Sequence, residues 1–262
     1  MHHVHNRVLA SSTLLLTLLL GGCGGGDSDD PTTIISQGKG GLMIGHYIET
    51  SSSDPDLDVG GFYVDLPSGE GLFKGEMSYH YAPCQDSNNQ SIVGTKLGTQ
   101  LNGTITGRLD NVSAADQVLA MTMDGDYASS NSNYSGDYSR TNRGNQVRTP
   151  AGCDFNYTVS NKGTFKVFAE NQHAPSEFVI TATNRLLTWP NISGAKKALV
   201  LLIDPSKTND GNGLVDQQYV FAPSSLITLA ASSSTAKTYI VSVQVFNANN
   251  TLLAYDNIRV TI

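Results

Sequence analysis

The sequence predicts an all-β protein: an N-terminal antiparallel β-sandwich or barrel followed by a smaller sandwich. Charged side chains make up only 15% of the 262 residues, against about 25% in an average soluble domain, so a helical bundle is not expected. Apolar and polar residues alternate with a period of two along much of the chain, which indicates strands with one buried face. The connections between these runs are short, which favours antiparallel pairing over strands that alternate with helices.

The larger module is predicted over residues 39–172. In residues 95–109, leucine and isoleucine side chains share one parity while polar side chains occupy the other. Gly103 and Gly107 fall on the buried parity, where glycine is expected to bend a strand, as in barrels. Further strands are expected at 41–49, 61–66, 73–81, 118–124, 155–159 and 164–169.

A boundary is predicted near residues 171–176, where His173-Ala174-Pro175 interrupts the alternation. The charge also changes there. Residues 23–175 contain 18 acidic and 9 basic side chains, whereas residues 176–262 contain 5 acidic and 6 basic side chains. The two parts therefore present different surfaces, which supports two modules.

The second module, residues 176–262, contains short apolar runs, with the chain's only tryptophan, Trp189, in the second run. Tyr239 opens a later run of alternating valines. This pattern resembles fibronectin type III domains, which place a Trp on the second strand and a Tyr at the start of the sixth. The resemblance implies an immunoglobulin-like sandwich that acts as a spacer or an interaction surface.

The first 22 residues have the organisation of a secretory signal peptide. Arg7 precedes an uncharged run over residues 8–20, which is too short to cross a membrane. The run ends at Leu20-Gly21-Gly22-Cys23, which resembles the lipobox of bacterial lipoproteins. The resemblance implies that residues 1–22 are removed and that Cys23 is acylated, for example by palmitate. Residues 23–38 then form a flexible acidic tether.

The resemblance also implies the membrane to which the lipid holds the chain. In enteric bacteria an Asp directly after the acylated Cys favours the inner membrane, and this chain has Gly24 there. We therefore expect a lipid anchor in the outer membrane, on its periplasmic face or at the cell surface.

Cys84 and Cys153 remain once Cys23 is assigned to the lipid. An even pair in an oxidising compartment predicts a disulfide, with two free thiols as the alternative. The bond would close a loop of about 70 residues and stabilise the fold by about 4 kcal/mol on the chain-entropy model.

Asp54, Asp56 and Asp58 form the strongest candidate metal site. Alternating carboxylates can surround a hard cation such as Ca²⁺, which takes six to eight oxygen ligands. The spacing departs from an EF-hand because Val59 stands at the position of its glycine. A solvated turn is the alternative, and no other cofactor is expected.

Tyr127, Tyr134 and Tyr138 form the candidate ligand-binding site. They lie in a Ser/Asn/Asp-rich stretch in which Gly-Asp-Tyr at 125–127 recurs at 136–138. Exposed tyrosine rings beside carboxylates and amides suit a glycan, because rings pack on sugar faces and polar groups bind hydroxyls. The alternative is a hairpin with solvated tips.

No catalytic residue is predicted. The sequence contains no HExxH, phosphate-binding loop, dinucleotide fingerprint or Gly-x-Ser-x-Gly motif. A net charge of −7 argues against nucleic acid as a partner. We therefore expect an outer-membrane-anchored, non-catalytic binding or envelope-structural protein whose partners are the membrane and an envelope protein or glycan. The alternative is a hydrolase of extracellular polymer or a glycan-binding accessory protein, which a cleft joining His46 or His80 to two carboxylates would favour.

Overall fold

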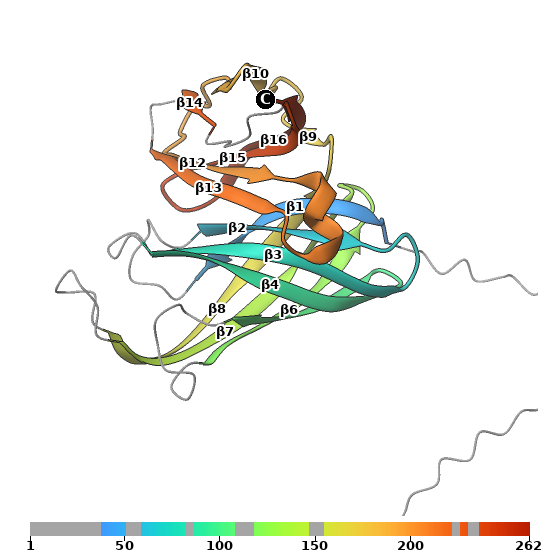
Figure 1. Ribbon diagram of the computed structural model, residues 1–262, viewed down its shortest axis with the longest axis vertical. Coiled ribbons are helices and arrows are strands. Elements are labelled where there is room, and N and C mark those ends of the chain that lie inside the picture. Colours follow the sequence, from blue (N-terminus) through green and yellow to red (C-terminus); the bar gives the residue numbers. More distant parts are fainter. Residues whose placement is uncertain are drawn as a thin grey trace, which may run out of the picture. The chain divides into compact units, whose positions relative to one another are not determined.

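Eight antiparallel strands close into a barrel, because β1 pairs with both β2 and β8 (Figure 1). The computed structural model describes residues 38–50, 59–81, 86–107, 118–146, 155–221, 226–229 and 236–262. The barrel strands are β1 (Gly41–Glu49), β2 (Val59–Leu66), β3 (Gly71–Tyr81), β4 (Asp86–Leu97), β5 (Gln100–Gly107), β6 (Val118–Ala128), β7 (Asn133–Gln146) and β8 (Phe155–Ala169).

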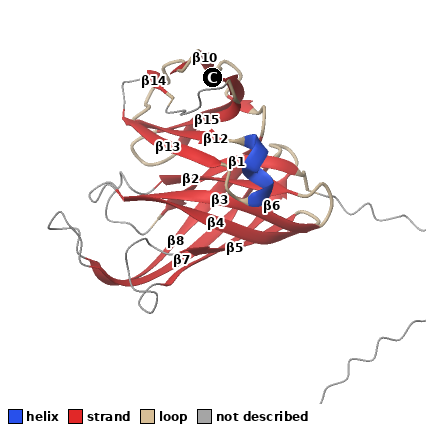
Figure 2. Ribbon diagram, in the orientation of Figure 1, coloured by secondary structure: helices blue, strands red, loops and turns tan. Residues whose placement is uncertain are grey.

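Two further sheets follow the barrel in the sequence. Three strands form the sheet β10 (Thr181–Thr183), β11 (Leu186–Thr188) and β14 (Leu226–Thr228). Five strands form the other, in the order β13 (Leu214–Phe221), β12 (Lys197–Ile203), β15 (Thr238–Phe246), β16 (Leu252–Thr261) and β9 (His173–Ala174). A short 3-10 helix, η2 (Pro205–Asp210), is the only helix in the described residues (Figure 2). The all-β prediction is confirmed.

The two ends of the barrel differ. At one end, which we term the near end, residues 38–40 lead into β1 and the turns 67–70, 98–99 and 129–132 connect neighbouring strands. At the far end the connections are 51–58, 82–85, 108–117 and 147–154, all of which lie outside the described residues.

The far-end connections contain two of the predicted sites. Asp54, Asp56 and Asp58 belong to the β1–β2 connection, Cys84 to the β3–β4 connection and Cys153 to the β7–β8 connection. The calcium site and the disulfide therefore lie outside the described residues, and both stay predictions.

Apolar side chains fill the barrel. The interior cluster includes Met43, Phe62, Phe73 and Phe165, each no more than 3% exposed. Burial of such side chains is the dominant favourable contribution to folding. The interior is thus a packed core.

A second core lies between the β10–β11–β14 sheet and the larger sheet. It contains Trp189 and Tyr239 together with Val200, Val241 and Val243. These valines face the smaller sheet, and the opposite face of the larger sheet is free to pack elsewhere.

That opposite face packs on the outside of the barrel. Ile44, Val59 and Tyr63 of β1 and β2 form one buried cluster with residues of the larger sheet, among them Leu199, Leu201, Ile203, Ile240 and Phe246. Strands β1, β2 and β12 are therefore buried on both faces. We term the two smaller sheets and the core between them the sandwich. The buried cluster, which we term the interface core, joins the barrel to the sandwich. Residues 35–262 form one compact unit.

Gly61 allows the two layers to approach closely. A Cβ atom at this position would lie 2.4 Å from Leu201 Cδ2 and 2.8 Å from Gln217 Oε1. Without a side chain, the Gly61 N–H donates to Gln217 Oε1 at 2.9 Å. The glycine thus permits both the apolar contact and a hydrogen bond across the interface.

We predict that Leu201→Ala lowers the free energy of unfolding by about 2–5 kcal/mol, because it leaves a cavity in the interface core. Leu186→Ala is the matched control, since Leu186 is exposed and a surface substitution changes stability by about 0.5 kcal/mol or less. Urea unfolding followed by Trp189 fluorescence measures both. Equal, small effects of the two substitutions would contradict the interface.

Candidate functional site

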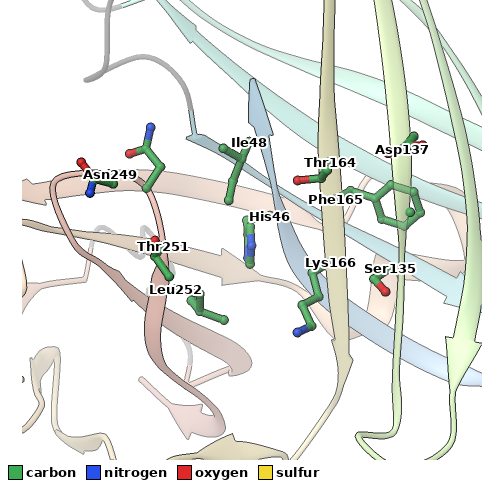
Figure 3. A pocket seen from close by; sticks show the side chains of 12 residues that line it. His46, Ile48, Ser135, Asp137, Thr164, Phe165, Lys166, Asn249, Thr251 and Leu252 are labelled. Carbon is green, nitrogen blue, oxygen red and sulfur yellow. The ribbon is translucent and has the colours of Figure 1, made fainter. Parts of the chain in front are cut away.

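A groove of about 600 Å³ lies between the outside of the barrel and the turn that joins β15 to β16 (Figure 3). The barrel side is formed by β1, β7 and β8, and the other side by residues 249–252. In Figure 3, Asn249, Thr251 and Leu252 lie on one side of His46, with Ser135 and Asp137 on the other. The groove therefore depends on the barrel and the sandwich being packed together.

The strand register places the barrel side chains in two rows. One row runs Ser135–Lys166–His46 across β7, β8 and β1. The next row runs Asp137–Thr164–Ile48 across the same strands. Alternation along each strand points both rows outward, so the groove carries hydroxyl, ammonium and carboxylate groups on a regular grid with strands about 4.8 Å apart.

His46 forms part of the floor and is fixed by the sandwich. Its Nδ1 lies 2.6 Å from Oε1 of Gln244 on β15, and its ring packs edge-on against Phe246 at 5.0 Å. Burial lowers the pKa of His46 to about 4, partly offset by the Gln244 hydrogen bond, and nearby Lys166 lowers it further. The imidazole is therefore neutral at physiological pH, and its Nδ1–H group donates a hydrogen bond to Gln244 Oε1.

The β15–β16 turn is held in one conformation by its own hydrogen bonds. Asn247 Oδ1 accepts from the N–H groups of Asn249 and Thr251, both at 2.9 Å. Asn250 adopts a left-handed backbone conformation with φ of 58°, which asparagine tolerates better than most residues. The wall of the groove is thus preorganised.

Two charged side chains, those of Lys166 and Asp137, line the groove. No ion pair in the described part of the chain involves Lys166 or Asp137, although the Lys166 ammonium lies 5.7 Å from the centre of the Phe168 ring. An ammonium and a carboxylate in this state offer charge-assisted hydrogen bonds to a polar ligand.

Ser135 and His46 are too far apart to act as a nucleophile and its base. Ser135 and His46 lie at opposite ends of one row, two strands and thus about 10 Å apart. A base must lie within about 3.2 Å of the nucleophile that it activates. The groove joins His46 to one carboxylate, that of Asp137, whereas the enzyme alternative required two.

A second hollow of about 420 Å³ adjoins the groove and shares Asp137 and Thr164 with it. It extends the polar face to β6, where Asp124 pairs directly with Asp137 in the register. Thr122 and Ser139 form the next pair, with their hydroxyl oxygens 2.8 Å apart. The two hollows therefore form one surface over β6, β7 and β8 that carries polar side chains, with His46 of β1 at its edge.

The structure corrects the prediction for Tyr127, Tyr134 and Tyr138. Tyr134 and Tyr138 are buried in the barrel interior, and half-buried Tyr127 packs against the same core. The Tyr134 hydroxyl donates to the Lys39 carbonyl at 2.8 Å, so this ring closes the near end of the barrel. These rings therefore do not form an exposed platform, and the stretch instead forms the β6–β7 hairpin.

Metal-ligating side chains do not gather in the described residues: no three His, Cys, Asp or Glu there are placed to hold an ion. No helix in that same part of the chain is long and apolar enough to cross a membrane.

No sequence motif marks the groove, although one feature of the sequence indicates the packing that forms it. Residues 198–203 are apolar throughout, whereas a strand of a two-sheet sandwich is expected to expose one face. An uninterrupted apolar strand indicates a second packing partner. His46 and Gln244, which that packing brings together, are 198 residues apart and carry no local pattern.

Comparison of the chain with protein-family models, with curated proteins and with solved structures finds no match. The function of the chain is therefore inferred from the geometry of the groove and from the N-terminal sequence.

We predict that acid destabilises the protein through His46. Its pKa is about 4 in the folded state and about 6.5 in the unfolded state, so the unfolded state binds more protons between these values. The contribution of neutral His46 to the free energy of unfolding is therefore complete above pH about 6.5 and is lost as the pH falls towards 4. Between pH 7.5 and 4.5 we expect the free energy of unfolding to fall by about 2–3 kcal/mol.

Urea unfolding at the two pH values measures this loss, with His46→Asn as the reference. Asparagine retains an N–H donor near the position of Nδ1 but does not titrate. The raised pKa of Glu76, caused by its burial, acts in both proteins and cancels in the difference. An identical pH dependence of the two proteins would exclude a role for His46.

Proposed function

We propose that this chain is a lipid-anchored binding protein of the cell envelope, held at the outer membrane through Cys23, and that the groove is its ligand site. The observation that carries the proposal is the rigid open groove, in which Lys166 and Asp137 form no ion pair with any residue that the structure describes. An open groove that combines apolar side chains with hydroxyl, ammonium and carboxylate groups suits an extended partner, such as a glycan or a protein segment, better than a small apolar molecule.

The sandwich supports the same proposal. Its arrangement, with β10–β11–β14 facing β13–β12–β15–β16, is what a fibronectin type III-like module over residues 176–262 would require. In this protein the module contributes one wall of the groove through the β15–β16 turn. A spacer that only separates domains would not need the interface core.

The structural use of the side chains with perturbed pKa values supports a non-catalytic role. His46 is neutral and fixed by Gln244, and Glu76 accepts a hydrogen bond from the Leu214 N–H at 2.7 Å. Both groups therefore hold the barrel to the sandwich. Perturbed pKa values can mark catalytic sites, but structural networks perturb them equally.

The lipid anchor has a direct test. We predict that Cys23→Ser releases the protein into the soluble periplasmic fraction, because the acyl chains supply the membrane affinity. Cell fractionation and immunoblotting measure the distribution. A Cys23→Ser protein that still sediments with membranes would show that the anchor proposal is wrong.

The groove is tested by crosslinking the lipid-anchored protein in its native envelope and identifying what is captured by mass spectrometry and glycan analysis. We predict that the double variant Lys166→Ser/Asp137→Ser lowers capture of the dominant partner at least about tenfold, since each charged hydrogen bond is worth about 1.5–3 kcal/mol.

Lys196→Ser/Asp210→Ser is the matched control. It removes the same two charges from exposed positions outside the groove and leaves the net charge unchanged. Equal capture by both double variants would contradict the assignment of the site. A dominant protein among the captured molecules identifies an assembly role, and a polysaccharide identifies a glycan-binding role.

A further inference from the structure

Three exposed apolar side chains gather at the near end of the barrel. Leu72 is 81% exposed, Leu97 52% and Val93 46%. The register pairs Leu72 on β3 with Thr95 on β4, and Val93 and Leu97 lie two residues to either side of Thr95 on the same face. Leu72, Val93 and Leu97 therefore form one surface cluster, which we term the near-end patch.

The chain enters the barrel directly beside this patch. The Gly38 N–H donates to the carbonyl of Gly98, the residue after Leu97, at 2.9 Å. Gly40 lies against the neighbouring turn, because a Cβ atom there would be 2.5 Å from the Pro67 carbonyl oxygen. Residues 38–40 thus pass between two turns, 67–70 and 98–99. Leu72 lies next to the first turn and Leu97 next to the second.

The two turns are joined to each other, so the patch is rigid. The Lys96 ammonium donates to the carbonyl oxygens of Pro67 and Gly69, each at 3.0 Å. Glu70 Oε1 accepts from the Gly98 N–H at 3.1 Å. A contact made by such a preorganised surface loses little conformational entropy.

We propose that the near-end patch rests on the bilayer that holds Cys23, with Leu72 and Leu97 inserted at the boundary between headgroups and acyl chains. The inference rests on the proposed lipid anchor. Roughly 15 residues separate Cys23 from Gly38, so an anchored chain keeps the patch within about 50 Å of the bilayer.

Tethering makes a weak surface contact sufficient. A site held near its target by a short linker experiences an effective concentration in the millimolar range, so a few apolar side chains bind without high intrinsic affinity.

The patch is also flanked by cations. Lys74 pairs with Val93 in the register, and Lys39 is exposed where the chain enters the barrel. Both ammonium groups suit anionic headgroups. The far end of the barrel then faces away from the membrane.

The experiment places a tryptophan in the patch of the lipidated, full-length mature protein. L72W is reconstituted into vesicles of phosphatidylglycerol and phosphatidylethanolamine whose acyl chains are brominated or unbrominated. L186W is the matched control, because it makes the same exposed Leu-to-Trp change on β11 of the sandwich. Trp189, which is 8% exposed, contributes the same background to both proteins.

Bromine quenches tryptophan only at close range. We expect brominated lipid to lower the emission of L72W and to leave L186W at its intensity in unbrominated vesicles. Adding L97S to L72W should weaken the quenching, since it removes a second inserted side chain. Both substituted positions are exposed, so the far-ultraviolet circular dichroism should match that of the wild type.

Two results would overturn this proposal without contradicting the lipid anchor. The first is L72W that floats with the vesicles but is not quenched, which leaves the lipid anchor standing. The second is a concentration-dependent blue shift of L72W without vesicles, which would assign the patch to a second copy of the chain. Protein that fails to float with vesicles would instead overturn the anchor itself, and this inference with it.

Discussion

The apolar contact between the outside of β1 and β2 and the five-stranded sheet is the interaction on which the rest of the structure depends. Ile44 and Tyr63 on the barrel meet Leu201 and Ile203 on the sandwich, and all four are fully buried. Without this layer His46 would be solvated, and the β15–β16 turn would not form a wall of the groove. The interface core therefore converts two small β structures into one body with a site between them.

Polar groups at the edge of that layer determine how the two parts fit. Glu76 accepts from the Leu214 N–H, and the Tyr63 hydroxyl accepts from the Gly213 N–H at 2.6 Å. Burial raises the pKa of both side chains. A buried polar group left unpaired costs about 1–3 kcal/mol, so a shifted or rotated sandwich is disfavoured. The buried apolar area stabilises the contact, and these hydrogen bonds fix the position and orientation of the sandwich on the barrel.

The sequence predicts the all-β class well because strand periodicity is a local signal. The interface is not local. Strands β1, β2 and β12 carry apolar residues on both faces, and that departure from alternation is the only trace of the contact in the sequence. The polar neighbours of Tyr134 and Tyr138 predict a surface position for both rings. Their shared parity is that of the barrel interior, a fact that depends on which face closes the barrel.

Function in this account follows from rigidity. A groove formed by a fixed turn and a paired sheet would bind the proposed ligand without reorganisation, and the proposed lipid at Cys23 would keep it in the envelope. The most direct test of the account is native-state hydrogen exchange at increasing urea concentration, which compares amides of β1 with amides of β12 and β15. One body predicts that both sets converge on the same opening free energy and the same urea dependence. A β12–β15 set that opens at lower free energy while β1 stays protected would show that the sandwich detaches, and would contradict the account.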